Sequence, residues 1–145
     1  MTEPTTTLAI IKPDAVAAGN SIKIITVIES SGFEIKSSFE TTLTVKQAQL
    51  FYTEHQDQPF FSDLVTFMSS GPLVLLALEL PESPSEVISR WRGLIGATNP
   101  QEADKGTIRA SFATSKSRNA VHGSDSVSSA ERELLLMSEF KNSYS

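Results

Sequence analysis

Short stretches of the chain differ in how their hydrophobic residues are arranged. Residues Thr7–Lys12 hold a continuous apolar run, which predicts a fully buried central strand. Leu73–Leu80 predicts another strand, whereas Phe33–Leu43 alternates loosely between apolar and polar residues, as in a long half-exposed strand. Asn119–His122 is short and mostly apolar, and we expect it to form the fourth strand.

Helical spacing and helix-start residues predict the segments between these strands. Apolar residues of Ser21–Ser31 recur at helical spacing, with Ser21 or Asn20 available as the N-cap. Thr44, Ser83 and Ser128 each begin a sequence typical of a helix N-terminus, with Gln or Glu three residues later. The helices after Ser21–Ser31 are predicted over residues 44 to about 54, 61–69, 83–95 and 128–137.

Residues Gly96–Arg118 show no clear periodicity, and a loop of this length inside a compact domain is usually functional or disordered. The order strand–helix–strand–helices–strand–helix–strand–helix is a split βαβ pattern. It predicts an α+β, ferredoxin-like sandwich, with a four-stranded antiparallel sheet and helices packed over one face. In this arrangement the strand ends at Lys12 and His122 can lie near each other.

The composition narrows the classes of function. The length of 145 residues, with 39% hydrophobic and 20% charged residues, predicts a single domain over residues 1–145. The lack of cysteine excludes disulfides, thiolate metal sites and a cysteine nucleophile. The net charge of −5 argues against nucleic acid as a partner, and a polyphosphate ligand would need a local cluster of lysine and arginine. We see no leader sequence and no apolar run that could span a membrane, so we expect a soluble cytoplasmic protein.

The stretch Asn119–Glu133, NAVHGSDSVSSAERE, is the strongest candidate for chemistry. It places His122 between a predicted strand and a turn that leads into a helix. Imidazole is a nucleophile near neutral pH, and the N–H groups at a helix start attract anions. A structural histidine explains this stretch about as well, because placed histidines are often structural.

Other candidate residues lie at the ends of predicted elements or in the long loop. Lysine and arginine bind phosphate, and an exposed aromatic ring can stack on a nucleotide base. Each residue also has a simpler explanation, as a solvated cation or a core aromatic. The sequence contains neither a P-loop nor a GxGxxG motif. The candidates are Lys12, Tyr52, Phe60, Arg92, Thr98 and Arg109.

Together these pieces resemble the nucleoside diphosphate kinase family. The matching stretches are IIKPDAV, FYTEHQDQPFFSDLVTFMSSGP, GATNP, GTIR and NAVHGSDSVSSAERE, which follow one another in the family's order from Thr7 to about Phe140. The NxxHGSDS signature is highly specific. The resemblance implies transfer of the γ-phosphate of a nucleoside triphosphate to a nucleoside diphosphate by a ping-pong mechanism.

The resemblance also implies a role for each matching residue. His122 would be phosphorylated on a ring nitrogen, Glu133 would orient the opposite nitrogen, and Ser124 would support the histidine. Phe60 would stack on the base. Asp125 would help to place Mg²⁺, which arrives with the nucleotide, and the family suggests a homo-oligomer built from dimers. The positions that would hold phosphates and ribose are Lys12, Tyr52, Arg92, Thr98, Arg109 and Asn119.

The chain departs from the family in several places. The segment Glu79–Ile88 is longer than usual, Lys116 replaces an aliphatic residue that closes over the base, and little of the C-terminal arm is present. Reduced kinase activity is one consequence of these departures to test. Two other interpretations therefore stay open: a nucleotide-binding or scaffold module with weak or no turnover, and a ferredoxin-like domain without a nucleotide site.

Overall fold

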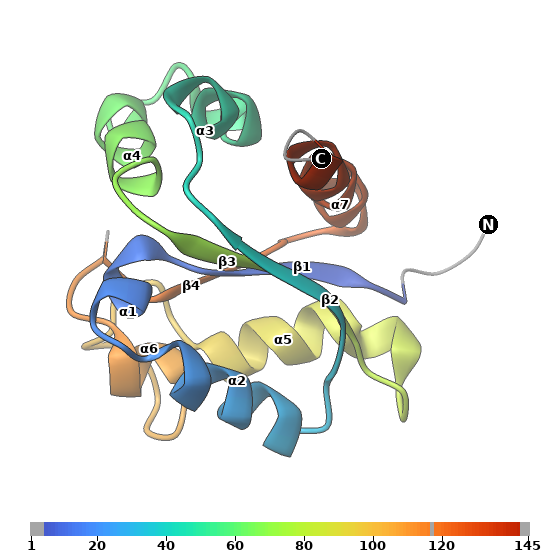
Figure 1. Cartoon of the computed structure of the whole chain (residues 1–145). Coiled ribbons are helices and arrows are strands. Elements are labelled where there is room, and N and C mark those ends of the chain that lie inside the picture. Colours follow the sequence, from blue (N-terminus) through green and yellow to red (C-terminus); the bar gives the residue numbers. More distant parts are fainter. Residues whose placement is uncertain (1–4, 117, 143–145) are drawn as a thin grey trace.

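The computed structural model describes residues 5–116 and 118–142 and contains one four-stranded sheet (Figure 1). All neighbouring strands are antiparallel, in the order β2-β3-β1-β4. The strands are β1 (Thr7–Ile11), β2 (Glu34–Thr41), β3 (Leu73–Glu79) and β4 (Val121–Gly123). The predicted α+β fold with an antiparallel sheet is therefore confirmed.

Helices fill the connections between the strands. The α-helices are α1 (Pro13–Ala17), α2 (Ser21–Ser30), α3 (Val45–Phe51), α4 (Phe61–Met68), α5 (Val87–Ile95), α6 (Ile108–Phe112) and α7 (Val127–Asn142). Two 3-10 turns, η1 (Thr53–His55) and η2 (Pro84–Glu86), follow α3 and precede α5. No helix in the described residues is long and apolar enough to cross a membrane.

Helices cover both faces of the sheet, so the expectation that they pack over one face was wrong. Figure 1 shows α3, α4 and α7 on one side of the sheet and α1, α2, α5 and α6 on the other. Leu8 and Ile10 of β1 belong to one buried cluster, while Ala9 and Ile11 belong to the other. Successive side chains of a strand point to opposite faces, so a strand covered on both sides needs an uninterrupted apolar run.

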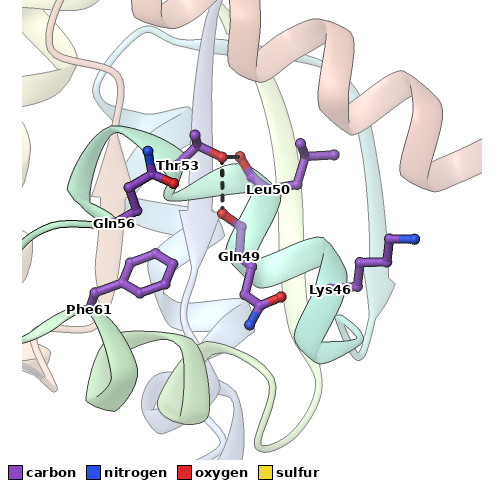
Figure 2. Close-up of a pocket in the computed structure, with 6 residues that line it drawn as sticks. All are labelled: Lys46, Gln49, Leu50, Thr53, Gln56 and Phe61. Carbon is purple, nitrogen blue, oxygen red and sulfur yellow. Dashed lines mark hydrogen bonds between the residues drawn. The ribbon is translucent and has the colours of Figure 1, made fainter.

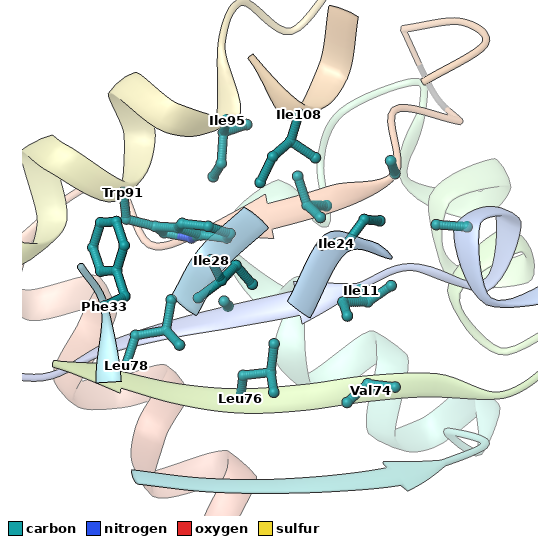
Figure 3. Packing of buried hydrophobic residues seen from close by; sticks show 14 of the residues in the cluster. Ile11, Ile24, Ile28, Phe33, Val74, Leu76, Leu78, Trp91, Ile95 and Ile108 are labelled. Atoms are coloured by element: carbon teal, nitrogen blue, oxygen red, sulfur yellow. The ribbon is translucent and has the colours of Figure 1, made fainter. Parts of the chain in front are cut away.

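Trp91 of α5 is the largest fully buried side chain and lies in the cluster on the sheet face that α1, α2, α5 and α6 cover (Figure 3). Its indole packs edge-on against Phe33, with ring centroids 5.9 Å apart. The indole Nε1–H donates to the carbonyl of His122 at 3.3 Å. The core therefore holds the backbone of β4 directly at the histidine.

The helix N-termini confirm the predicted side-chain cap at Thr44 and correct those at Ser128 and Ser83, while Asn20 occupies the N-cap position of α2 without a side-chain hydrogen bond. At Thr44, the side chain accepts from the Gln47 N–H and the Gln47 side chain accepts from the Thr44 N–H, which is a complete capping box. At α7, Ser126 and not Ser128 accepts from the Ser129 N–H, so the helix begins at Val127. Ser83 makes no side-chain cap among the described residues, because the first turn there is the 3-10 turn η2.

Two short helices were not predicted. Residues 13–17 form α1, where no element was predicted, and residues 108–112 form α6 inside the segment interpreted as a loop. The Thr107 side chain caps α6 by accepting from the Ala110 N–H at 3.3 Å. Each of these helices has five residues, too few to show helical periodicity.

Candidate functional site

His122 lies in the middle of β4 and pairs with Ile10 of β1. Its side chain is 19% exposed, and its ring lies edge-on against Phe51 and Tyr52, with centroids 5.4 and 6.3 Å away. Its Nε2 lies 2.8 Å from Oε1 of Glu133 on α7. Because a carboxylate only accepts hydrogen bonds, Nε2 carries the proton and Nδ1 has the free lone pair.

Ser124 shares the same carboxylate oxygen. Its hydroxyl donates to Oε1 of Glu133 at 2.9 Å, and both residues are buried. The Ser124 N–H donates to the carbonyl of Leu8 at 3.4 Å, so β1 holds the chain just after His122. Two donors thus fix the position of the Glu133 carboxylate, which in turn fixes the imidazole.

Lys12 and Asn119 form a second buried group. Nζ of Lys12 donates to Oδ1 of Asn119 at 2.8 Å, and Nδ2 of Asn119 donates to the carbonyls of Lys116 at 2.9 Å and Thr98 at 3.4 Å. Burial, aided by the charge of Arg109, lowers the pKa of Lys12 from 10.5 to about 8, although Asp14 opposes the shift. The ammonium group is therefore still charged at neutral pH but loses its proton a little above it.

Asp14 is a residue that sequence reasoning missed. Its carboxylate accepts from the Ala120 N–H at 3.1 Å, and the Ala120 carbonyl accepts from the Lys12 N–H at 2.8 Å. Ala120 has φ of 73°, a backbone conformation that is uncommon for a residue other than glycine. These bonds hold the strained turn between Asn119 and His122, and the only sequence signal was an acidic residue two positions after Lys12.

Two arginines bind the backbone around β4. The Arg109 guanidinium donates to the carbonyls of Val121 at 3.0 Å and Gly96 at 3.2 Å, while Arg92 donates to the Gly123 carbonyl at 3.1 Å. Burial and the neighbouring Arg92 lower the pKa of Arg109 to about 10, so it is charged at neutral pH. Nε of Arg109 is buried and has no hydrogen-bond partner among the described residues.

A small hollow of about 50 Å³ opens beside the histidine. It is lined by Phe51, Tyr52, Glu54, His55, His122, Gly123, Asp125, Arg132 and Glu133. The Tyr52 hydroxyl is buried without a partner among the described residues. Burial, and then the charge of Glu133, raise the pKa of Tyr52, so its phenol remains a donor at all ordinary pH values.

The remaining predicted residues lie at or near the surface. Phe60 is 49% exposed at the start of α4, and its ring centroid is 5.6 Å from that of His55. Thr98, Arg92 and Asp125 are also exposed. A hydrogen bond from Ser129, aided by the charge of Arg92, lowers the pKa of the Asp125 carboxyl and keeps it ionised at neutral pH.

A second, larger hollow of about 420 Å³ lies against α3 and α4 (Figure 2). It is lined by Lys46, Gln49, Leu50, Thr53, Gln56 and Phe61. The Thr53 hydroxyl donates to the carbonyls of Gln49 and Leu50, so it is already partnered. With a single charged side chain and no histidine or carboxylate, this lining lacks the groups for the chemistry that His122 can perform, although it is the larger hollow.

The fold and the site together indicate a protein that acts on phosphate groups. A histidine oriented by a carboxylate, with a lysine and two arginines around it on an antiparallel sheet, suits chemistry on phosphate groups.

The comparisons with known proteins name the family. The family model described as "Nucleoside diphosphate kinase" matches residues 5–142. The chain is 53% identical to "Nucleoside diphosphate kinase 1" of Protochlamydia amoebophila, over 89% of each protein, and 48% identical to the nucleoside diphosphate kinase of Haemophilus ducreyi, over 88% of this chain and 90% of the relative. The Aquifex aeolicus nucleoside diphosphate kinase structure superposes with a TM-score of 0.86 at 42% identity, covering 92% of this chain and 94% of that one. The chain belongs to the nucleoside diphosphate kinase family.

Proposed function

We propose that this protein transfers the γ-phosphate of a nucleoside triphosphate to a nucleoside diphosphate through a phosphohistidine at His122. The observation that carries the proposal is the 2.8 Å bond from Nε2 of His122 to Glu133, which leaves the Nδ1 lone pair on a residue that lines the hollow. The relatives that share about half of the sequence bear the name of this activity.

In the first half-reaction, Nδ1 of His122 attacks the γ-phosphorus. A P–N bond forms as the bond from the γ-phosphorus to the bridging oxygen breaks, and the nucleoside diphosphate leaves with that electron pair. In the second half-reaction, a terminal oxygen of another diphosphate attacks the phosphohistidine and returns the electron pair to Nδ1. Glu133 accepts from Nε2 throughout and stabilises the charge that develops on the ring.

The cationic and neutral donors of the site stabilise the phosphates. Lys12, Arg92 and Arg109 supply positive charge, and the unpartnered Tyr52 hydroxyl supplies a donor. Asn119 accepts from the Lys12 ammonium and donates to the Thr98 carbonyl, and we propose that Asn119 and Thr98 contact the ribose and phosphates.

Phe60 is the residue we propose for stacking on the base. Its ring is half exposed, and stacking without hydrogen bonds to base edges would accept several nucleotides. Lys116 is exposed, and its backbone carbonyl accepts from Asn119. Its aliphatic stem would cover the nucleotide base.

Mg²⁺ is the cation we propose to accompany the nucleotide. Among the described residues, no three histidine or acidic side chains gather as a metal site, and Asp125 offers one ionised carboxylate at the hollow. This fits a cation that the nucleotide's own phosphates hold for the most part. When bound, Mg²⁺ neutralises charge on the phosphates.

We also propose a homo-oligomer built from dimers. In the described sheet, β2 is an edge strand with one neighbour, β3. An edge strand of eight residues presents unpaired backbone groups that a second copy of the chain can satisfy.

Initial-rate kinetics with ATP and a series of diphosphates test the proposed function. The ping-pong mechanism predicts parallel lines in double-reciprocal plots, because the first product leaves before the second substrate binds. Tight ADP binding by calorimetry with negligible phosphate exchange would instead indicate a nucleotide-binding module. Intersecting lines would exclude the phosphohistidine route.

A further inference from the structure

Arg132 of α7 immediately precedes Glu133 and makes three contacts with the end of α3 and with η1. Its guanidinium donates to the carbonyls of Phe51 at 2.8 Å and Leu50 at 3.5 Å. It also forms an ion pair with Glu54, at 3.0 Å from Oε1. Arg132 and Glu54 both line the hollow beside His122.

The contacts of Arg132 fall where a helix needs partners. Leu50 and Phe51 are the last two residues of α3, and the final carbonyls of a helix lack N–H partners within it. The Leu50 carbonyl also accepts from the Thr53 hydroxyl at 2.7 Å, so the contact of Arg132 that matters most is the one with the Phe51 carbonyl. A cation at this end also complements the helix dipole. Arg132 thus stabilises the end of α3 from a segment about eighty residues away in the sequence.

Directly after this contact, the chain becomes one wall of the hollow. Tyr52 follows Phe51, and η1 then carries Glu54 and His55 into the lining. On the other side of Arg132, the Glu133 carboxylate holds the His122 ring. Two successive residues of α7 therefore hold two different walls, one through the imidazole and one through the end of α3.

We propose that Arg132 is a positioning residue for nucleotide binding, because it sets the distance between the wall that carries Tyr52 and the nucleophile His122. This inference rests on the proposed function. The Arg132–Glu54 pair is partly exposed, with side chains 35% and 54% accessible, and exposed ion pairs add little to stability. Loss of Arg132 therefore changes nucleotide affinity more than it changes folding.

Three variants test the inference: Arg132→Gln, Arg132→Lys and Glu54→Gln. The matched control is Arg90→Gln, which removes an exposed arginine paired with Glu86 at 3.1 Å on α5. For each protein, ADP affinity by calorimetry, kcat and KM for ADP, phosphoenzyme formation at saturating ATP, and Tm are measured.

We expect Arg132→Gln to raise the Kd and KM for ADP about tenfold, because a wall displaced by a fraction of an ångström misplaces its donors. Phosphoenzyme formation at saturating ATP and kcat should change much less, since Glu133 still holds His122. Arg132→Lys should recover part of the affinity, and Arg90→Gln should match the wild type.

Glu54→Gln separates positioning from direct contact with phosphate. Glu54→Gln removes a negative charge from the hollow, which by itself should favour the binding of a polyphosphate. It also leaves the Arg132 guanidinium without its ion-pair partner. If Arg132 acts through the wall, Glu54→Gln nevertheless weakens ADP binding; if Arg132 contacts phosphate directly, binding tightens. Tighter binding would overturn the proposal.

Arg132→Gln with an unchanged KM and Kd but a lower Tm would also overturn it, since that is the result of a purely structural contact. If Arg132→Gln does not fold, as judged by circular dichroism, Arg132→Lys and Glu54→Gln decide the question. A wild-type protein without exchange activity would contradict the proposed function; an active wild type with variants equal to it would contradict only the role of Arg132.

Discussion

The inner and outer parts of the site are built differently. In the inner part, Lys12, Asn119, Ser124 and Glu133 are buried, and hydrogen bonds of 2.8 to 2.9 Å join them to one another or to His122. The outer part consists of exposed side chains on loops and helix ends: Phe60, Arg92, Thr98 and Lys116. Buried polar groups are costly when a partner is lost, whereas exposed ones are solvated instead. We therefore expect inner substitutions to affect the chemical step, with Lys12 also contributing charge to nucleotide binding, and outer ones to affect nucleotide affinity alone.

Glu133→Ala should have the largest effect on turnover. It leaves the Ser124 hydroxyl and Nε2 of His122 without their acceptor and frees the ring to rotate, so kcat should fall by about 100-fold. Steady-state exchange between ATP and another diphosphate measures this loss. Glu131→Ala, an exposed acidic residue of the same helix, is the control. A wild-type kcat in Glu133→Ala would remove the distinction between inner and outer parts.

Gly123→Ala tests how tightly the core holds the inner part. A Cβ at this position would lie 2.7 Å from both Nε1 of Trp91 and Cδ1 of Ile95. Trp91 is fully buried and cannot move aside cheaply, so the free energy of unfolding should fall by about 1–3 kcal/mol. Chemical denaturation measures this, with Gly93→Ala as control because nothing lies within 4 Å of that position. Equal stability of the two variants would show that the packing around β4 is loose.

Phe60→Ala probes the outer part. Loss of a base–aromatic stack costs about 1–3 kcal/mol, so ADP and GDP should each bind at least about fivefold more weakly while phosphoenzyme formation at saturating ATP persists. Calorimetry with both nucleotides gives the two ratios. Leu135→Ala, on a 62% exposed residue of α7, serves as the control. A loss confined to one base would mean that Phe60 reads base identity.

The pH dependence of ADP binding tests the contribution of the Lys12 charge. The pKa of Lys12 is about 8 in the folded protein, below its ordinary 10.5. Above pH 8 the free site loses its ammonium charge, so affinity should fall by up to about tenfold between pH 7 and pH 9. Lys12→Met should bind weakly at both pH values. A wild-type affinity that is flat over this range would contradict the assignment.

The lowered pKa of Lys12 also predicts that folding stability depends on pH. The unfolded chain keeps the Lys12 proton up to about pH 10.5, whereas the folded chain releases it near pH 8. Between these values the unfolded state binds more protons, so the contribution of Lys12 to folding stability rises with pH. Chemical denaturation at pH 7.5 and pH 10 measures the free energy of unfolding of the wild type and of Lys12→Met. The change from pH 7.5 to pH 10 should be more favourable to the folded state in the wild type than in Lys12→Met.

The fold was predictable where the pattern was long. The apolar runs of β1 and β3 predicted buried strands, and the Thr44 capping box was confirmed. The same runs indicate that both faces of the sheet are covered, which the prediction of one covered face overlooked. Several serines precede α7, so the sequence pattern did not identify Ser126 as the cap.

The sequence suggested candidate residues for the site but not the contacts between them. His122 and Glu133 are eleven residues apart in one motif, which the resemblance to the family placed together. Asp14 bonds to Ala120 across 106 residues, and Arg132 reaches Glu54 across 78. Such contacts depend on the pairing of β1 with β4 and on the packing of α7, which no local pattern encodes.

Labelling with γ-³²P-ATP tests the central claim most directly. The wild-type protein should yield an acid-labile, base-stable phosphoprotein that transfers its label to added GDP. His122→Ala should not label, whereas His55→Ala, which removes the other of the two histidines, should still label. Equal labelling of wild type and His122→Ala would contradict the assignment of His122 as the nucleophile.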